Sequence, residues 1–198
     1  MSGTFPSTPK FMNLSVSSIQ PTLEARTISG RRQARQIAGQ YWVMTATFPP
    51  MTRAEFSPIW AFIITQRGSF DTFLLQPTVH KDTQGNSSGS PKVKNASQTG
   101  RTITTDGWPT SATVMKAGDF VKFSGHTKVY LITGDVTSDG SGDASMSIEP
   151  ALLSSPADNE DVIYNNVPFT VSLGGQVQQF SAGKGDVYTY EVGFREVF

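Results

Sequence analysis

Two stretches with strand-like patterns frame the segment between residues 39 and 77. Residues 41–48 are rich in Tyr, Trp, Val and Thr, which favours a half-buried strand. The prolines at 49 and 50 end this strand because proline cannot donate to a β-ladder. Residues 69–75 return to strand composition before Pro77. We therefore expect a strand, an intervening element and a second strand.

The intervening element is an amphipathic helix, with Gly68 after its end. The apolar residues at helical spacing are Phe56, Ile59, Trp60 and Ile63. Thr52 followed by Glu55 forms a capping-box pattern. That start leaves Pro58 inside the helix, where proline costs ~3 kcal/mol. The alternative start has Ser57 as the cap and Pro58 at the first helical position. Both starts keep an apolar stripe that needs a sheet to lie on.

The N-terminal third predicts an extended terminal segment followed by a long hairpin. Residues 1–21 hold three prolines and many hydroxyl residues, typical of an extended segment that is ordered only if something holds it. A frayed terminus is the alternative. Residues 22–28 and 33–48 have strand character on either side of Gly30, which supplies turn chemistry. We expect the apolar residues of the terminal segment to pack on a neighbour: Phe5, Phe11, Leu14 and Ile19.

After Pro77 the pattern becomes one of short strands and glycine-rich turns. Residues 83–91 are rich in Gly, Ser and Asn and predict a flexible or turn-rich connector. Five short segments beyond it favour strands, which fits a small closed barrel of the OB type. They are residues 101–105, 119–123, 128–133, 144–148 and 161–164.

The last part of the chain returns to longer strands, at residues 167–173 and 186–198. A terminal strand with Tyr188, Tyr190 and Phe194 needs a sheet to join. The nearest candidate is the sheet of residues 22–77. The barrel is then an insertion within one discontinuous domain.

Composition supports a β-rich chain without a membrane segment. Only 16% of the 198 residues are charged, and 18 Gly and 12 Pro accompany many Ser and Thr. The sequence contains no cysteine, which excludes disulfides, thiolate metal sites and cysteine nucleophiles. No apolar run approaches the roughly 20 residues that span a bilayer. We expect a soluble protein that stays where it is made.

The formal net charge is zero, but the charges are unevenly placed. Residues 1–50 hold five basic side chains against Glu24, whereas residues 87–166 hold six basic against nine acidic ones. The acidic middle argues against a general nucleic-acid binder. The basic group at the predicted hairpin is either a solvated face or a charged contact with another subunit. Its members are Arg26, Arg31, Arg32 and Arg35.

The sequence offers little for catalysis, metals or cofactors. His80 and His126 lack partners at metal-like spacing, and the aspartates at 135, 139 and 143 are typical of a turn rather than a calcium loop. Phosphate-loop and nucleophile-elbow motifs are absent. We therefore expect no catalytic residues, no metal and no cofactor. Trp108, Lys122 and Tyr130 could form a ligand face on the barrel, or they could fill its interior.

An ordered set of short motifs over roughly residues 22–198 resembles the distal tail protein of siphophages, the long-tailed bacteriophages, in the version from phages of Gram-negative hosts. Each motif is weak alone, and their order and spacing carry the resemblance. They are Gln40-Tyr41-Trp42, the helix before Arg67-Gly68, the strand 70–75, Gln98-Thr99-Gly100, Lys116-Ala117-Gly118-Asp119, residues 126–133 and the final Phe194-Arg195-Glu196.

The resemblance implies a mainly β fold. A discontinuous β-sandwich belt domain with one α-helix, residues 1–86 and 167–198, carries an inserted OB-like β-barrel, residues 87–166. The belt would form a homohexameric ring that joins the tail tube to the tail hub or baseplate, with no catalytic residues. The protein would be made in the host cytoplasm and reside in the virion, and DNA would pass through the ring without specific binding.

The sequence leaves two other function classes open. OB-like barrels take oligosaccharides or single-stranded nucleic acid, so the chain could be such a binding module, or the ring could make a weak contact with host glycans. A cell-envelope hydrolase has only unassigned carboxylates in its favour. Titration of residues 87–166 with glycans and polynucleotide tests for the binding module, and a zymogram tests for the hydrolase.

Overall fold

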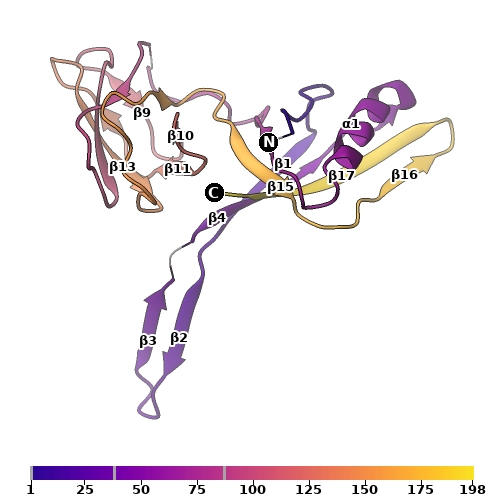
Figure 1. Cartoon of the computed structure of the whole chain (residues 1–198), viewed down its shortest axis with the longest axis horizontal. Coiled ribbons are helices and arrows are strands. Elements are labelled where there is room, and N and C mark those ends of the chain that lie inside the picture. The colour runs from indigo at the N-terminus through magenta and orange to yellow at the C-terminus, as the bar shows by residue number, and fades with distance from the viewer. Residues whose placement is uncertain (1, 38, 87) are drawn as a thin grey trace. The chain divides into compact units, whose positions relative to one another are not determined.

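The computed structural model describes residues 2–37, 39–86 and 88–198 (Figure 1). Strands hold 41% of the residues and helix 7%, which confirms the prediction of a mainly β protein with one helix in the described ranges. The chain divides into two compact units. Unit 1 comprises Met1–Lys10, Thr72–Val171 and Val197–Phe198, and unit 2 comprises Phe11–Asp71 and Ser172–Glu196.

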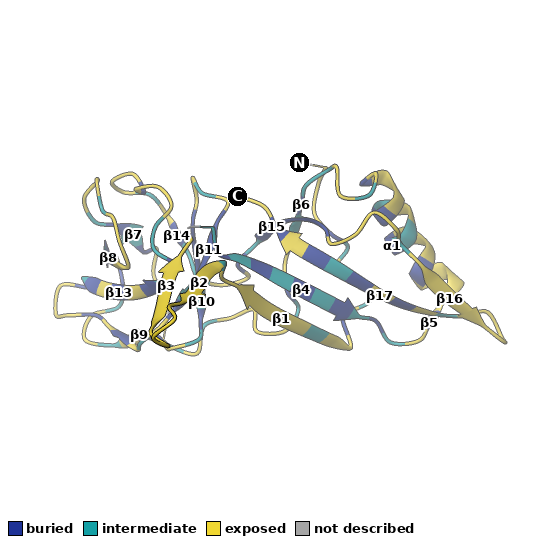
Figure 2. Ribbon diagram, turned by 90° about the horizontal axis from the view of Figure 1, so that it is seen from below, coloured by how far each residue is buried: buried dark blue, intermediate teal, exposed yellow. Residues whose placement is uncertain are grey.

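Unit 2 is built on an antiparallel sheet in which β4 (Tyr41–Thr47) lies between β1 (Asn13–Ile19) and β17 (Val187–Glu196). Two short strands, β5 (Met51–Thr52) and β16 (Phe180–Gly183), also pair with β17. The C-terminal strand therefore joins the sheet predicted for it. Burial alternates along β4 and β17, as Figure 2 shows, so only one face of the sheet is covered.

The helix α1 (Arg53–Thr65) starts at Thr52, and the alternative start at Ser57 is wrong. The backbone N–H and the hydroxyl of Thr52 both donate to the carboxylate of Glu55, at 2.9 and 2.8 Å. Pro58 lies inside the helix. The earlier start brings Phe56 into the helix, where it is buried, and this burial together with the cap offsets the cost of the proline.

An aromatic cluster fixes α1 to the hairpin of β16 and β17. Phe56 stacks on Tyr188 with ring centroids 4.9 Å apart, and Trp60 meets Phe180 edge-on at 4.9 Å. Ile59 and Ile63, further members of the predicted stripe, are almost fully buried. The stripe thus packs as the helical spacing predicted.

The N-terminal apolar residues pack on the chain itself. In unit 1, Phe5 is buried with its ring 6.1 Å from that of Phe73, and in unit 2, Phe11 is buried edge-on to Phe48 at 5.2 Å. β1 is hydrogen-bonded to β4 along its whole length. The segment is held by intrachain contacts, so the alternative of a frayed terminus is wrong. Ile19, in contrast, stays exposed.

Unit 1 contains a nearly closed small barrel. Its sheet has the order β14-β10-β11-β13-β8-β7, and the neighbours are antiparallel. A bridge between Lys92 of β7 and Asp161, next to β14, brings the two edges together. The strands are β7 (Lys92–Val93), β8 (Thr102–Asp106), β10 (Phe120–Phe123), β11 (Val129–Ile132), β13 (Ala144–Glu149) and β14 (Val162–Ile163).

All five strands predicted for the barrel are present, and three short ones went unpredicted: β7, β9 (Thr113–Met115) and β12 (Val136–Thr137). β9 and β12 form a separate two-stranded pair. Elsewhere in unit 1, β6 (Phe73–Leu75) pairs with β15 (Phe169–Leu173). The predicted strand over residues 69–75 is shorter than expected because residues 66–70 form turns.

The start of the connector, residues 83–86, is held by hydrogen bonds, which favours the turn-rich alternative over the flexible one. Asp119 is 2% exposed and accepts hydrogen bonds from the backbone N–H of Lys116 (2.8 Å), from the Thr83 hydroxyl and from the N–H of Gln84 (3.1 Å). Burial alone raises the pKa of Asp119, but these hydrogen bonds outweigh burial and lower the pKa below its usual value. Asn86 N–H donates to the carbonyl of Thr113 at 2.8 Å. We call residues 83–86 and Asp119 the connector clamp.

Candidate assembly surface

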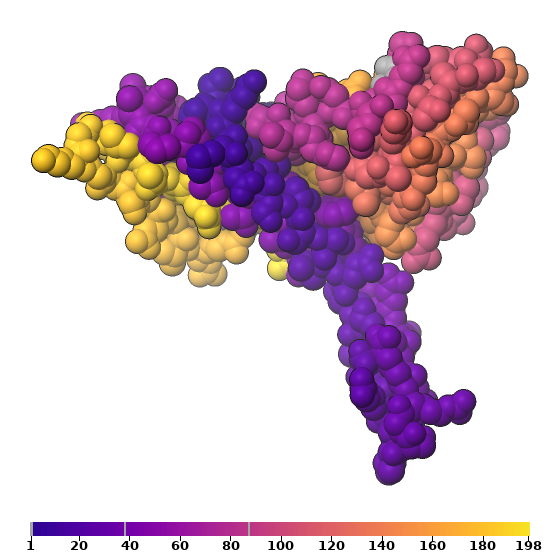
Figure 3. Space-filling view, turned by 180° about the vertical axis from the view of Figure 1, so that it is seen from behind, coloured from indigo at the N-terminus to yellow at the C-terminus, as the bar shows by residue number. Residues whose placement is uncertain are grey.

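The predicted hairpin exists as a two-stranded ribbon, β2 (Thr22–Arg26) with β3 (Arg32–Gln36). These strands pair with each other and, among the residues described, with no other strand. The predicted continuous strand over 33–48 is instead divided into β3 and β4. Figure 3 shows the ribbon standing clear of the sheet of its own unit. We call residues 22–37 the arm.

The turn of the arm explains why the chain reverses here. Thr27 N–H donates to the carbonyl of Arg31 at 3.0 Å, and Gly30 N–H donates to the carbonyl of Thr27 at 2.9 Å. Gly30 has φ +80°, a conformation that favours glycine. The Thr27 hydroxyl also accepts from the backbone N–H of Arg31 at 3.1 Å. The turn therefore follows from local residues and needs no tertiary support.

The four arginines predicted as an interface all lie on the arm and are all exposed. The register places Arg26 opposite Arg32, so their like charges share one face, and Glu24 pairs with Arg32 at 3.0 Å. Arg35 lies opposite Leu23 on the other face. Within the described ranges, the side chains of Arg26, Arg31 and Arg35 have no ion pair or hydrogen bond. The arm therefore presents uncompensated positive charge.

The arm also exposes apolar side chains. All ten residues of β2 and β3 are exposed, Leu23 to 60%, and Ile28 at the turn is fully exposed. An isolated two-stranded ribbon is marginally stable in water, because it has no apolar layer to pack on. Leucine, isoleucine and unpaired arginine on one ribbon are the composition of a contact surface rather than of a solvated loop.

The uncovered face of the unit 2 sheet is lined by hydroxyl groups. The residues of β1 and β4 that point outward include Ser15, Ser17, Thr45 and Thr47, and the register places Thr47 beside Glu191 of β17. The guanidinium of Arg195 lies over the ring of Tyr41, 4.2 Å from its centroid. The face is polar and half-exposed, and its hydroxyl groups can donate to and accept from a partner surface.

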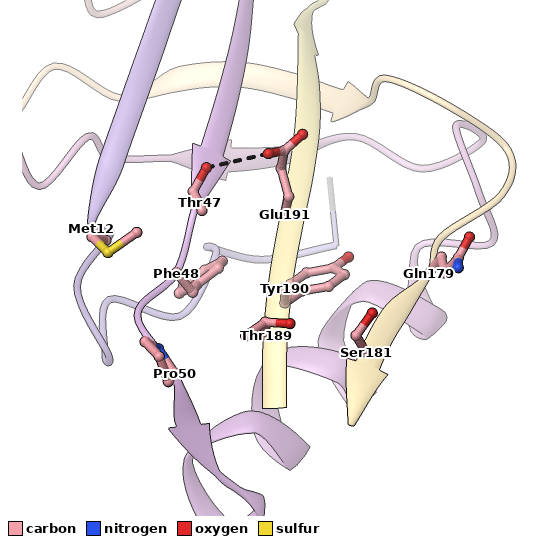
Figure 4. A pocket seen from close by; sticks show the side chains of 9 residues that line it. All are labelled: Met12, Thr47, Phe48, Pro50, Gln179, Ser181, Thr189, Tyr190 and Glu191. Atoms are coloured by element: carbon pink, nitrogen blue, oxygen red, sulfur yellow. Dashed lines mark hydrogen bonds between the residues drawn. The ribbon is translucent and has the colours of Figure 1, made fainter. Parts of the chain in front are cut away.

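At one end of this face lies an open groove of about 450 Å³ (Figure 4). Met12, Phe48 and Pro50 form an apolar side. Glu191 supplies the one charged group of the lining, and its carboxylate accepts a hydrogen bond from the hydroxyl of Thr47 at 3.4 Å. Tyr190 stacks on Phe48 with centroids 6.0 Å apart, and burial raises its pKa. The remaining lining residues are Thr47, Gln179, Ser181 and Thr189.

The three residues considered for a ligand face on the barrel are buried. Trp108 is 4% exposed and donates its indole N–H to Thr105 at 2.8 Å. Tyr130 is fully buried, and its hydroxyl accepts from the N–H of Leu153 at 3.3 Å. The ammonium of buried Lys122 donates to the carbonyl of Pro168 at 3.0 Å. Trp108 and Tyr130 belong to the buried core of the barrel, which favours the alternative that they fill its interior. Lys122 lies between the core residues Val121 and Phe123 on β10 and therefore points to the other face of that strand.

The two histidines and the aspartates at 135, 139 and 143 have structural partners. His80 contacts the carbonyl of Gly118 at 2.9 Å, and His126 lies 3.9 Å from the carboxylate of Glu160. Asp139 accepts from the N–H groups of Ser141 and Asp143 at 2.8 and 3.0 Å, which confirms the turn interpretation, and these bonds lower its pKa. No group of ligands that could hold a metal occurs in the part of the chain that the structure describes.

The groove went unpredicted because it combines residues near 12, 47–50 and 179–191, which only the sheet brings together. One signal was present in the sequence. The alternation along the C-terminal strand puts Thr189 and Glu191 on the face opposite Tyr190.

The helix α1 lacks the length and apolar character that a bilayer crossing requires, and it is the one helix in the described ranges.

Residues 74–167 match the family described as distal tail protein pb9, B domain. The match spans somewhat less than half of the 198 residues and contains the barrel and its connector clamp. A search of curated proteins finds no match for the chain.

Proposed function

We propose that the chain is a structural, non-catalytic component of a bacteriophage tail tip, because residues 74–167 match the family described as distal tail protein pb9, B domain. It acts as a homohexameric ring that joins the tail tube to the tail hub or baseplate. We propose the belt domain, residues 1–86 and 167–198, as the ring-forming part, and residues 87–166 as an inserted OB-like domain. The match of residues 74–167 carries this proposal.

The arm supports ring formation. A ring of identical subunits needs a head-to-tail contact between two different surfaces of the chain. The arm provides a basic and apolar surface that its own protomer leaves uncovered. Arg26, Arg31, Arg32 and Arg35 would then lie at a subunit or tube interface, where charge complementarity fixes the register and speeds association.

The other partners follow from the same role. Tail-tube protein contacts one side of the ring and hub or baseplate proteins the other, and the ring resides in the virion after synthesis in the host cytoplasm. DNA passes through the channel. A chain of zero formal net charge suits a channel that must not grip DNA. A ring can require its tube partner as a template, since binding to a partner lowers the cost of association.

The test is charge reversal on the arm. We expect the R31E/R32E variant to stay monomeric in light scattering with purified tail-tube protein, under conditions where the unaltered chain forms rings. The K92E/K116E variant makes the same charge change on the barrel and serves as control, with ring mass retained. Ring assembly by R31E/R32E at the level of the unaltered chain would remove the arm from the interface. Absence of rings from every preparation of the unaltered chain would contradict the proposed function.

A further inference from the structure

The arm and the groove of unit 2 are complementary in chemistry. The turn of the arm presents fully exposed Ile28 and the uncompensated guanidinium of Arg31. The groove presents an apolar side, with Met12 64% exposed, and the carboxylate of Glu191. Among the described residues, no cation lies within ion-pair distance of Glu191.

Glu191 is well placed to receive a guanidinium. It projects from β17 on the uncovered face of the sheet, beside Thr47, as Figure 4 shows. The Thr47 hydroxyl occupies one carboxylate oxygen at 3.4 Å, a long contact that leaves acceptor capacity free. Arginine binds carboxylates through two parallel N–H···O bonds, which fixes orientation as well as adding attraction.

We propose that the tip of the arm of one copy docks in the groove of a second copy, with Arg31 on Glu191 and Ile28 against Met12 and Pro50. This inference rests on the proposed ring and names the contact that closes it. Arm and groove are different surfaces of the same chain, so the contact is head-to-tail, and repeating it generates a closed ring when the rotation permits. It covers the apolar residues that each surface leaves in water.

A disulfide test locates the contact directly, because the sequence has no cysteine of its own. The full chain carrying I28C and M12C is assembled with tail-tube protein and oxidised. We expect a ladder of linked copies on a denaturing gel. The control pairs I28C with V177C, since Val177 is 85% exposed in the same unit and lies outside the groove. A ladder no stronger than the control, in a preparation that contains rings, would overturn the proposal.

A charge swap tests the polar half of the contact. We expect E191R alone, and R31E alone, to weaken ring assembly by about tenfold or more, as one lost interfacial charge pair does. The combination E191R/R31E restores the pair in reverse and should return assembly to within about threefold of the unaltered chain. Circular dichroism checks that each variant is folded.

The outcomes separate this inference from the proposed function. Rings that form normally with E191R, and show no link between residues 28 and 12, contradict the docking site and leave the ring intact. Disulfides from I28C to a cysteine introduced on tail-tube protein, in place of links to a second copy, assign the tip to another occupant and overturn the proposal. No rings with the unaltered chain contradict both.

Discussion

The connector clamp and the arm are both short, polar, loop-like stretches in the sequence, yet they end in opposite environments. The clamp brings its polar groups to a buried carboxylate, so each finds a partner inside unit 1. The arm leaves three arginines without a side-chain partner and three large apolar residues in water, Leu23, Ile28 and Ile37, among the residues described. The difference separates residues that complete their own fold from residues that await another molecule.

The largest effect on stability is expected in the barrel, from Trp108→Ala. The substitution removes a buried indole and its hydrogen bond to Thr105. We expect a loss of about 3–5 kcal/mol in the free energy of unfolding, measured by urea denaturation. A loss below about 1 kcal/mol would show that the indole of Trp108 is not packed in the interior and would favour the alternative that it is part of a ligand face.

The next effect is expected at the clamp, from Asp119→Asn. The amide keeps the shape but cannot accept all the hydrogen bonds, so we expect a loss of about 1–3 kcal/mol at pH 7. Because the folded pKa of Asp119 is lowered, its contribution is present above the unfolded value of about 3.9 and disappears as pH falls through the folded pKa. The two proteins should converge in thermal melts below that range.

Constant separation of these melts between pH 7 and the acid limit would contradict an ionised carboxylate at the centre of the clamp. Hydrogen exchange gives a second readout. The N–H groups of Gln84 and Asn86 should lose protection in Asp119→Asn, while the β4 amides stay protected.

A smaller effect is expected at the helix start, where unit 2 satisfies its own polar groups as the clamp does. Thr52→Ala removes the hydroxyl that donates to Glu55 at 2.8 Å. We expect a loss of roughly 1 kcal/mol in unfolding free energy by denaturant titration. Ser57→Ala is the matched control, because Ser57 lies inside the helix. A larger loss for the control would favour the rejected start.

The smallest effect on stability is expected on the arm, from Leu23→Ser. Leu23 is 60% exposed, so the change should alter unfolding free energy by less than about 0.5 kcal/mol. Its effect should appear in assembly with tail-tube protein, read by light scattering. A stability loss comparable to that of Trp108→Ala would mean that the arm is part of the fold of the protomer and not a free surface.

The sequence predicted elements well where the signal was local. The alternation in β4 and β17, the capping box at Thr52 and the five barrel strands all follow from neighbouring residues. The clamp was missed because Thr83 and Asp119 are far apart in the chain, and composition alone gives the connector the character of a flexible linker. Charge counting found the arm but not the groove, whose lining comes from three separate stretches.

The burial of Trp108 and Tyr130 shows a second limit of the sequence. Tyr130 lies on the four-residue strand β11, and so few alternating positions do not define an inward side. Trp108 lies in the loop after β8, where no strand alternation applies. The Pro58 ambiguity was of the same kind. Its resolution required knowing that Phe56 has Tyr188 to stack on, a contact over more than a hundred residues of chain.

The most direct test of the account compares the mass of the full chain with that of a chain whose arm is shortened, each assembled with tail-tube protein and weighed by native mass spectrometry. Replacing residues 23–35 by Asn-Gly leaves Thr22 opposite Gln36, a pair that such a two-residue turn can close. We predict a ring of six copies for the full chain and monomers for the shortened chain. Rings of equal mass from both chains would contradict the claim that assembly resides in the arm.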